Sequence, residues 1–104
     1  MFCFFKNKKS VDTFIEELAP MYSDVEFINC ENDYESAICD ADIIVTAISS
    51  QEPVLKARWI KPGTLYIHVA GIEDEFAVAR MASKIVCDCW EAVKHRKQTD
   101  CTNV

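Results

Sequence analysis

Glycine is scarce in this chain: its 104 residues include two, Gly63 and Gly71. Loops that hold phosphate groups through the backbone need several closely spaced glycines, because only glycine lets the main chain approach the anion unobstructed. The sequence accordingly contains no Gly-x-Gly-x-x-Gly segment and no Walker sequence. A glycine-rich phosphate cradle cannot be built from these residues.

Long apolar runs, a secretory leader and an excess of positive charge are missing as well. No apolar stretch approaches the ~18 residues of a membrane-spanning helix. The apolar residues 2–5 precede a group of lysines, which reverses the order of a signal peptide. The formal net charge is −6, which gives little support for nucleic-acid binding. We therefore expect a cytoplasmic protein with no membrane and no nucleic-acid partner.

Motifs for metal binding and nucleophilic catalysis are absent from the sequence. The chain has two histidines and six cysteines, but it has no Cys-x-x-Cys pair and no paired histidine spacing. The closest thiols are Cys87 and Cys89, and neither Gly-x-Ser-x-Gly nor His-Glu-x-x-His occurs. We predict that there is no metal site and that the cysteines are free thiols that serve as small hydrophobic residues.

Hydrophobic periodicity divides the chain into alternating strands and helices. Half of the residues are hydrophobic, which is enough for a packed core. The predicted strands are residues 2–5, 24–29, 43–47, 64–70 and 84–88. The predicted helices are residues 10–19, 32–39, 76–82 and 89–95. This alternation predicts one α/β domain with a mainly parallel sheet over residues 1–97, followed by a frayed tail over residues 98–104.

Two helix starts carry capping signals. Ser10 precedes an apolar stripe with the spacing of one buried helix face, formed by Val11, Phe14, Ile15 and Leu18. Asn32 and Glu35 have the spacing of a capping box. In the third predicted helix, Phe76 and Ala79 are expected to face inward, with Val78 as a further candidate.

The stretch from Ala41 to Gly71 contains the predicted ligand site, because its two predicted strands each end in small or hydroxyl residues. Ligands of open α/β sheets bind outside the carboxyl ends of parallel strands. Thr46, Ser49 and Ser50 fit two interpretations equally well: they could hydrogen-bond a flat ligand, or they could simply form a turn.

Few residues are candidates for acid–base chemistry. His68 interrupts an apolar strand and fits a hydrogen-bonded sheet residue better than a general base. Glu73 and Asp74 could hold a general acid or base, although stabilisation of the following helix N-terminus is the simpler interpretation. Trp59 and Trp90 are expected in a core or an interface rather than in a substrate stack.

Five segments form a recognisable series: residues 41–47 (ADIIVTA), 53–55 (PVL), 59–64 (WIKPGT), 84–88 (KIVCD) and 90–96 (WEAVKHR). In this order they resemble the NAD(P)-binding domain of the ornithine cyclodeaminase/mu-crystallin family. The likeness covers residues 1–97 and is strongest over residues 40–97.

The resemblance implies a Rossmann-type domain that holds NAD or NADP. Enzymes of the family take a hydride from the α-carbon of an amino acid and give an imine; ornithine cyclodeaminase then loses ammonia and forms proline, whereas relatives reduce ketimines or oxidise alanine. By position, the resemblance assigns cofactor contacts to Lys6, Asn7, Thr46, Ala47, Ile48, Ser49, Val69, Ala70 and Gly71. It places the catalytic aspartate of the family at Glu73 or Asp74 without choosing between them. The basic loop at residues 6–8 leans towards the 2′-phosphate of NADP.

The chain also departs from the family pattern. It lacks the first Rossmann strand with its glycine-rich loop and the separate substrate domain, and Ile48 replaces a small or hydroxyl residue. We therefore expect a partial Rossmann-like sheet of about five strands, in a fragment or remnant that is inactive alone and binds the cofactor weakly or not at all.

Loss of the first strand predicts an open sheet edge. Either the remaining strands close up in the order 3-2-4-5-6, or a second copy or a complementing chain covers the gap. The alternative function is a small interaction or regulatory module that reuses half of a Rossmann fold.

Overall fold

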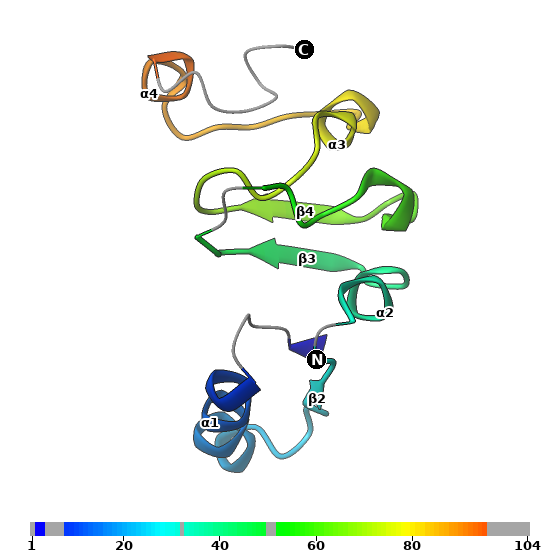
Figure 1. Ribbon diagram of the computed structural model, residues 1–104, viewed down its shortest axis with the longest axis vertical. Coiled ribbons are helices and arrows are strands. Elements are labelled where there is room, and N and C mark those ends of the chain that lie inside the picture. Colours follow the sequence, from blue (N-terminus) through cyan, green and yellow to red (C-terminus); the bar gives the residue numbers. More distant parts are fainter. Residues whose placement is uncertain (1, 4–7, 32, 50–51, 96–104) are drawn as a thin grey trace. The chain divides into compact units, whose positions relative to one another are not determined.

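The computed structural model describes residues 2–3, 8–31, 33–49 and 52–95. The chain divides into two compact units, Met1–Ala41 and Asp42–Val104. Each unit combines helices with a two-stranded parallel sheet, as the ribbon in Figure 1 shows. The α/β class and the parallel pairing predicted from the sequence are therefore confirmed. Within the described ranges, every helix is too short or too polar to cross a bilayer.

The first unit is a short β-α-β arrangement. β1 (Phe2–Cys3) pairs in parallel with β2 (Ile28–Asn29). Between them lie α1 (Lys8–Leu18) and the 3-10 turn η1 (Ala19–Met21), and α2 (Tyr34–Ile38) follows. A parallel pair needs such a crossover connection, because its two strands run in the same direction.

Helix α1 buries the apolar stripe that its spacing predicts. Val11 is fully buried, and the ring of Phe14 meets that of Phe27 edge-on at a centroid distance of 6.4 Å. Asp12 Oδ1 accepts a hydrogen bond of 3.0 Å from Asn29 Nδ2, which ties the helix to the end of β2. The predicted cap at Ser10 is wrong, because the helix already begins at Lys8. Lysine is a good helix former, so the two lysines before Ser10 extend the first turn.

The N-cap of helix α2 lies one residue later than predicted. Asp33 is its N-cap, and Asp33 Oδ1 accepts a hydrogen bond of 3.1 Å from the backbone N–H of Ser36. Glu35 lies in the first turn, where its charge favours the positive end of the helix. The predicted cap, Asn32, lies outside the described residues.

The second unit is built around two strands that run in the same direction (Figure 1). β3 (Ile43–Thr46) pairs with β4 (Leu65–His68), with Ile43 opposite Leu65 and Thr46 opposite His68. The 3-10 turn η2 (Ala57–Trp59) lies between them in the chain, and α3 (Phe76–Met81) and α4 (Trp90–His95) follow.

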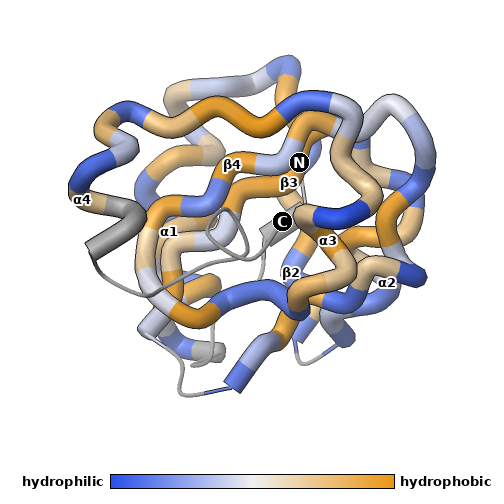
Figure 2. Tube along the Cα trace, turned by 90° about the horizontal axis from the view of Figure 1, so that it is seen from above, coloured by the Kyte–Doolittle hydropathy of each residue, from blue (hydrophilic) through white to orange (hydrophobic). Residues whose placement is uncertain are grey.

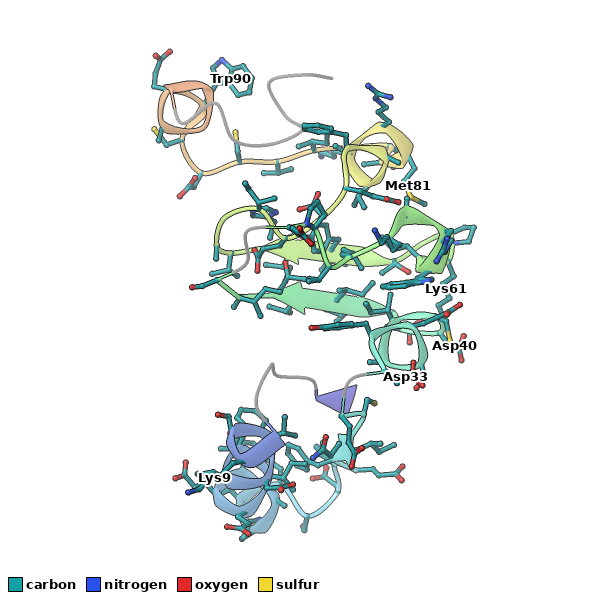
Figure 3. The ribbon with its side chains drawn as sticks, in the orientation of Figure 1. Lys9, Asp33, Asp40, Lys61, Met81 and Trp90 are labelled. Carbon is teal, nitrogen blue, oxygen red and sulfur yellow. The ribbon has the colours of Figure 1, made fainter. Side chains whose placement is uncertain are left out.

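The starts of the two strands are held by a turn and an ion pair. Gly63 adopts a φ of 86°, a left-handed conformation that favours glycine, in the turn before β4. Thr64 Oγ1 donates to the carbonyl of Lys61 at 2.8 Å. Lys61, which is labelled in Figure 3, also places its Nζ 3.0 Å from Asp42 Oδ1 just before β3.

Alternation gives the β3–β4 sheet two different faces. Ile44 is 6% exposed and shares its face with Tyr66 and the other even-numbered residues of both strands. Figure 2 colours most of β3 as hydrophobic. The face opposite Ile44 is entirely apolar by alternation, and its side chains are 41–62% exposed. We call this the odd face; it consists of Ile43, Val45, Leu65 and Ile67.

Segment 84–88 corrects one prediction. It was expected to form a strong strand, but it is irregular and exposed throughout, with Val86 80% exposed. A β-branched run becomes a strand only when another strand offers it a pairing edge, and this run pairs with none among the described residues. The expected single sheet of about five strands is likewise not found in the described ranges, where each sheet has two strands.

Several residues expected in the interior are exposed. The prediction is wrong for Phe76, which is 56% exposed, whereas the further candidate Val78 is 6% exposed and anchors α3. Trp90 of α4 is 48% exposed and projects from its helix in Figure 3. Both aromatic rings lie where the chain supplies too few packing partners to cover them.

Four cysteines, Cys30, Cys39, Cys87 and Cys89, are free thiols, as predicted, but most of these four are not buried. Cys39, Cys87 and Cys89 are exposed, and Cys30 is half-buried. Burial, followed by the nearby charge of Asp33, raises the pKa of the Cys30 thiol. The prediction that they act as buried hydrophobic residues is therefore wrong for the three exposed thiols.

Candidate functional site

The candidate site lies where β3 and β4 end. Parallel strands bring their carboxyl ends to the same edge, so the loop after Thr46 and the loop after His68 are neighbours. The chain then returns past these loops, because Leu55 and Asp74 form an isolated parallel bridge. The carbonyl of Glu73 accepts the backbone N–H groups of Val54 and Leu55, each at 2.9 Å.

Glu73 ties the two strand-end loops together. Its side chain is fully buried, and its two carboxylate oxygens accept backbone hydrogen bonds from different loops. Oε2 accepts the N–H of Ile48 at 2.7 Å, and Oε1 accepts the N–H of Ala70 at 2.8 Å. Hydrogen bonds to an ionised acceptor are stronger than neutral ones, so this carboxylate compensates much of the cost of its burial. We call Glu73 with these two amides the loop clamp.

Four polar side chains form a connected cluster beside the loop clamp. Thr46 and Tyr66 bond across the strands, with Thr46 Oγ1 2.8 Å from Tyr66 Oη. Tyr66 Oη donates to Asp74 Oδ1 at 3.0 Å, and His68 Nδ1 lies 2.7 Å from the same oxygen. Because Thr46, Tyr66 and His68 are even-numbered residues of paired strands, they share the covered face of the sheet.

Tyr66 is a donor that keeps its proton. Burial raises its pKa well above the ordinary tyrosine range, the charges of Asp74 and Glu73 add to this effect, and only the bond to Thr46 opposes it. The phenolic proton points to Asp74, so the phenolic oxygen accepts the proton of the Thr46 hydroxyl. The direction of the hydrogen-bond chain is therefore fixed from Thr46 through Tyr66 to Asp74.

His68 faces acceptors on both ring nitrogens. Nδ1 lies against Asp74 Oδ1, and Nε2 lies 3.0 Å from the carbonyl oxygen of Ala70. Nε2 is also 3.7 Å from Glu73 Oε1. The imidazolium form can donate to both bonded oxygens, whereas a neutral ring can donate to one of them. His68 is thus a hydrogen-bonded sheet residue, as its sequence context indicated, and it is also in direct contact with an acidic candidate.

The structure separates the two acidic candidates. Glu73 uses both oxygens for backbone amides. Asp74 uses Oδ1 for two donors, while Oδ2 has no hydrogen-bond partner among the described residues. Asp74 therefore keeps one oxygen without a hydrogen bond among the described residues, on a side chain that is 6% exposed.

The cofactor-contact residues suggested by the resemblance fall into several groups. Thr46 belongs to the polar cluster, and the amides of Ile48 and Ala70 belong to the loop clamp. Small or apolar residues exposed at the same edge are Ala47, Ser49 and Val69. Gly71 is half-buried in the second loop. Lys6 and Asn7 lie outside the described residues.

Tyr66 was missed at the level of sequence. Its position two residues before His68 and its strand alternation place it on the same face as Thr46, and this is the signal that could have identified it. The contact of Asp74 with this face depends on the tertiary fold, so no local sequence pattern predicts it. Among the described residues, no group of His, Cys, Asp and Glu side chains is arranged to hold a metal ion.

Parallel strands with helices, whose carboxyl ends carry a connected polar cluster, place this chain in the α/β class. This chain belongs to the ornithine cyclodeaminase/mu-crystallin family, which matches residues 4–100. The chain is also similar to a Rhizobium meliloti (strain 1021) protein named "Putative dehydrogenase RB0419", with 53% identity over 36 residues. That match covers 35% of this chain and 11% of the relative. The family expected from the five sequence segments is confirmed.

Proposed function

We propose that this chain forms one wall of a nicotinamide-dinucleotide site of the ornithine cyclodeaminase kind, with Asp74 as its acid–base residue. The observation that carries the proposal is the position of Asp74 at the carboxyl ends of two parallel strands, bonded to Tyr66 and His68. This edge is where open α/β sheets bind ligands. Family membership supplies the chemical class of the ligand.

The edge residues fit the flat end of such a cofactor. Val69, the residue after β4, is 60% exposed, and Ile72, further along the same loop, is 47% exposed. Together with the small exposed residue Ala47, they offer an apolar surface on which an aromatic ring can pack. When bound, a nicotinamide group supplies a hydride acceptor.

The same edge does not fit a phosphate group. The backbone amides of Ile48 and Ala70, which an anion could otherwise use, are occupied by the carboxylate of Glu73. A second negative charge beside this carboxylate would be repelled. We therefore propose that this chain holds the nicotinamide end of the cofactor, binds the whole dinucleotide weakly and does not turn over substrate alone.

Asp74 has the properties that the acid–base role requires, and Glu73 does not. A proton acceptor needs an oxygen within reach of the ligand. Oδ2 of Asp74 is the oxygen left for this role, since Tyr66 and His68 both bond Oδ1. Glu73 acts by holding the loops in place, and its two oxygens are unavailable to a ligand.

Calorimetric titration with NADH and NADPH tests the proposal. We expect saturable binding with a dissociation constant near or below ~1 mM. Val69→Asp should abolish this binding, because it adds a charge to the apolar edge, whereas the matched control Val86→Asp should retain it, because segment 84–88 lies outside the site. Absence of binding at several times ~1 mM, or equal loss in both variants, would contradict the proposal.

The odd face favours a second candidate function, that of an interaction module. Its side chains, Ile43, Val45, Leu65 and Ile67, are all substantially exposed. Parallel sheets are normally covered on both faces, so a second copy of the chain or a complementing chain is the expected cover. If the chain associates through this face and binds neither dinucleotide, the interaction function is the better description.

A further inference from the structure

We propose that Tyr66 and His68 are positioning residues that lock one oxygen of Asp74 and leave the other for a ligand. The proposal deepens the function given above, and its ligand-facing part rests on that function. The locking of Asp74 does not depend on that function, because it follows from hydrogen bonds between residues that the structure describes.

The first step of the argument is the convergence of two donors on one atom. Tyr66 Oη and His68 Nδ1 lie 3.0 Å and 2.7 Å from Oδ1 of Asp74. These donors come from the same face of β4, two residues apart, so their spacing is set by the strand and not by flexible side chains. A carboxylate on a loop thereby takes its orientation from a strand.

The second step is that both donors are themselves held in place. Tyr66 is bonded across the sheet to Thr46 of β3. His68 is fixed at its far nitrogen by the carbonyl of Ala70, and its ring packs edge-on against that of Tyr66 at a centroid distance of 6.1 Å. Supporting hydrogen bonds of this kind hold a functional side chain in one orientation.

The third step distinguishes positioning from catalysis. Both nitrogens of His68 are engaged within the protein, and the hydroxyl of Tyr66 already has a donor and an acceptor. Neither residue has a free polar atom to offer to a substrate. Oδ2 of Asp74 is the atom of the cluster that has no partner in the described ranges, so it is the atom at which a proton is exchanged with a ligand.

The side-chain rotamer of Asp74 in the full chain provides the test. Three-bond couplings from the Asp74 carboxyl carbon to the backbone report whether χ1 occupies one rotamer or averages over several. We expect a single rotamer in the wild type and in the conservative variant His68→Asn, whose amide can still donate from the position of Nδ1. We expect averaged couplings in His68→Leu and in the double variant Y66F/H68L.

The expected pattern, with rescue by asparagine, supports positioning, because a purely structural loss in His68→Leu would not be restored by a polar residue. Averaged couplings in the wild type, or one rotamer in every variant, would overturn the proposal. If the double variant does not fold, the comparison of His68→Asn with His68→Leu decides the question. His95→Gln serves as the control that removes the other histidine of the chain.

Titration of the same samples with NADH separates this inference from the proposed function. Couplings that show a single Asp74 rotamer, without NADH binding, would contradict the cofactor site and leave the positioning role intact. NADH binding with a freely averaging Asp74 would contradict the positioning role and leave the cofactor site intact.

Discussion

Glu73 Oε2 accepts a hydrogen bond of 2.7 Å from the backbone N–H of Ile48, which is 25 residues away in the chain. The other oxygen of the same carboxylate holds Ala70. One buried side chain thus joins the loops that follow β3 and β4, and the whole candidate site is built on this connection.

Removal of the clamp should destabilise the second unit strongly. Glu73→Ala leaves two partly buried amides without an acceptor and opens a cavity, so we expect a loss of about 3–5 kcal/mol in the free energy of unfolding. Glu73→Gln should cost about 2–3 kcal/mol, since its amide group places a donor against a donor. Urea denaturation measures both losses, and the exposed control Glu17→Gln should stay within about 0.5 kcal/mol of the wild type. A mild effect of Glu73→Ala would show that the clamp is dispensable.

The raised pKa of Tyr66 predicts how stability depends on alkaline pH. Its folded-state pKa lies above its unfolded value, so its contribution to stability is complete below about pH 10, the ordinary tyrosine pKa. Above that pH the unfolded chain releases the proton first, and the folded state loses stability as pH rises. The variant Tyr66→Phe should show a shallower decline than the wild type in unfolding measured across this range. Identical slopes would mean that the phenol is not held in its protonated form.

The turn before β4 depends on a left-handed backbone conformation. Gly63→Ala should cost about 1–2 kcal/mol, because an L residue at a φ of 86° is strained. The cost should be purely conformational, since a Cβ atom at this position would meet nothing within 4 Å. Gly63→Asn should lose less, because asparagine tolerates this region better. Thermal unfolding compares the two variants, and a larger loss in the asparagine variant would refute the assignment.

The cap of α2 can be tested within the first unit. Asp33→Ala removes the side-chain acceptor of the Ser36 amide and should cost about 1 kcal/mol. Asp33→Asn keeps an acceptor oxygen and should restore most of the loss. Amide hydrogen exchange at Ser36 should rise in the alanine variant and stay low in the asparagine variant. Equal exchange in both would show that the cap has no role.

The odd face predicts self-association. Val45→Lys should lower it, because the charge falls in the middle of the apolar face, where Val45 is opposite Ile67. Sedimentation velocity over a range of concentrations measures the effect. The control Val86→Lys, at a residue 80% exposed on segment 84–88, should behave like the wild type. A wild-type chain that stays monomeric at every concentration would contradict the proposed cover by a second copy.

The sequence predicted the elements that are determined by local patterns. The apolar stripe of α1 and the Pro-Gly turn before β4 correspond to observed structure. The continuous run at Ile43–Val45 forms a strand, but the burial on both faces that such a run indicates is wrong, because Ile43 and Val45 are 62% and 58% exposed. The strand predicted over residues 84–88 is wrong, because β-branched residues indicate a preference for strand conformation but do not show whether another strand is available to pair with them.

The site shows the same division between local and long-range information. Its position at the strand ends, and the presence there of Thr46 and an acidic residue, follow from the β-loop-β order. The different roles of Glu73 and Asp74 do not, because neighbouring carboxylates look alike in a sequence. The bridge between Asp74 and Leu55 fixes this segment in the fold. In that position the Glu73 side chain points into the interior and the Asp74 side chain points towards Tyr66.

The exposed aliphatic side chains of β3 and β4 also determine how the protein must be handled in the laboratory. If the chain self-associates through this face, a nicotinamide affinity measured at the concentrations of calorimetry would belong to the assembly and not to the single chain. Light scattering before each titration sets the working concentration. A mild non-ionic detergent is the additive suited to this protein, because it covers apolar surface without adding charge.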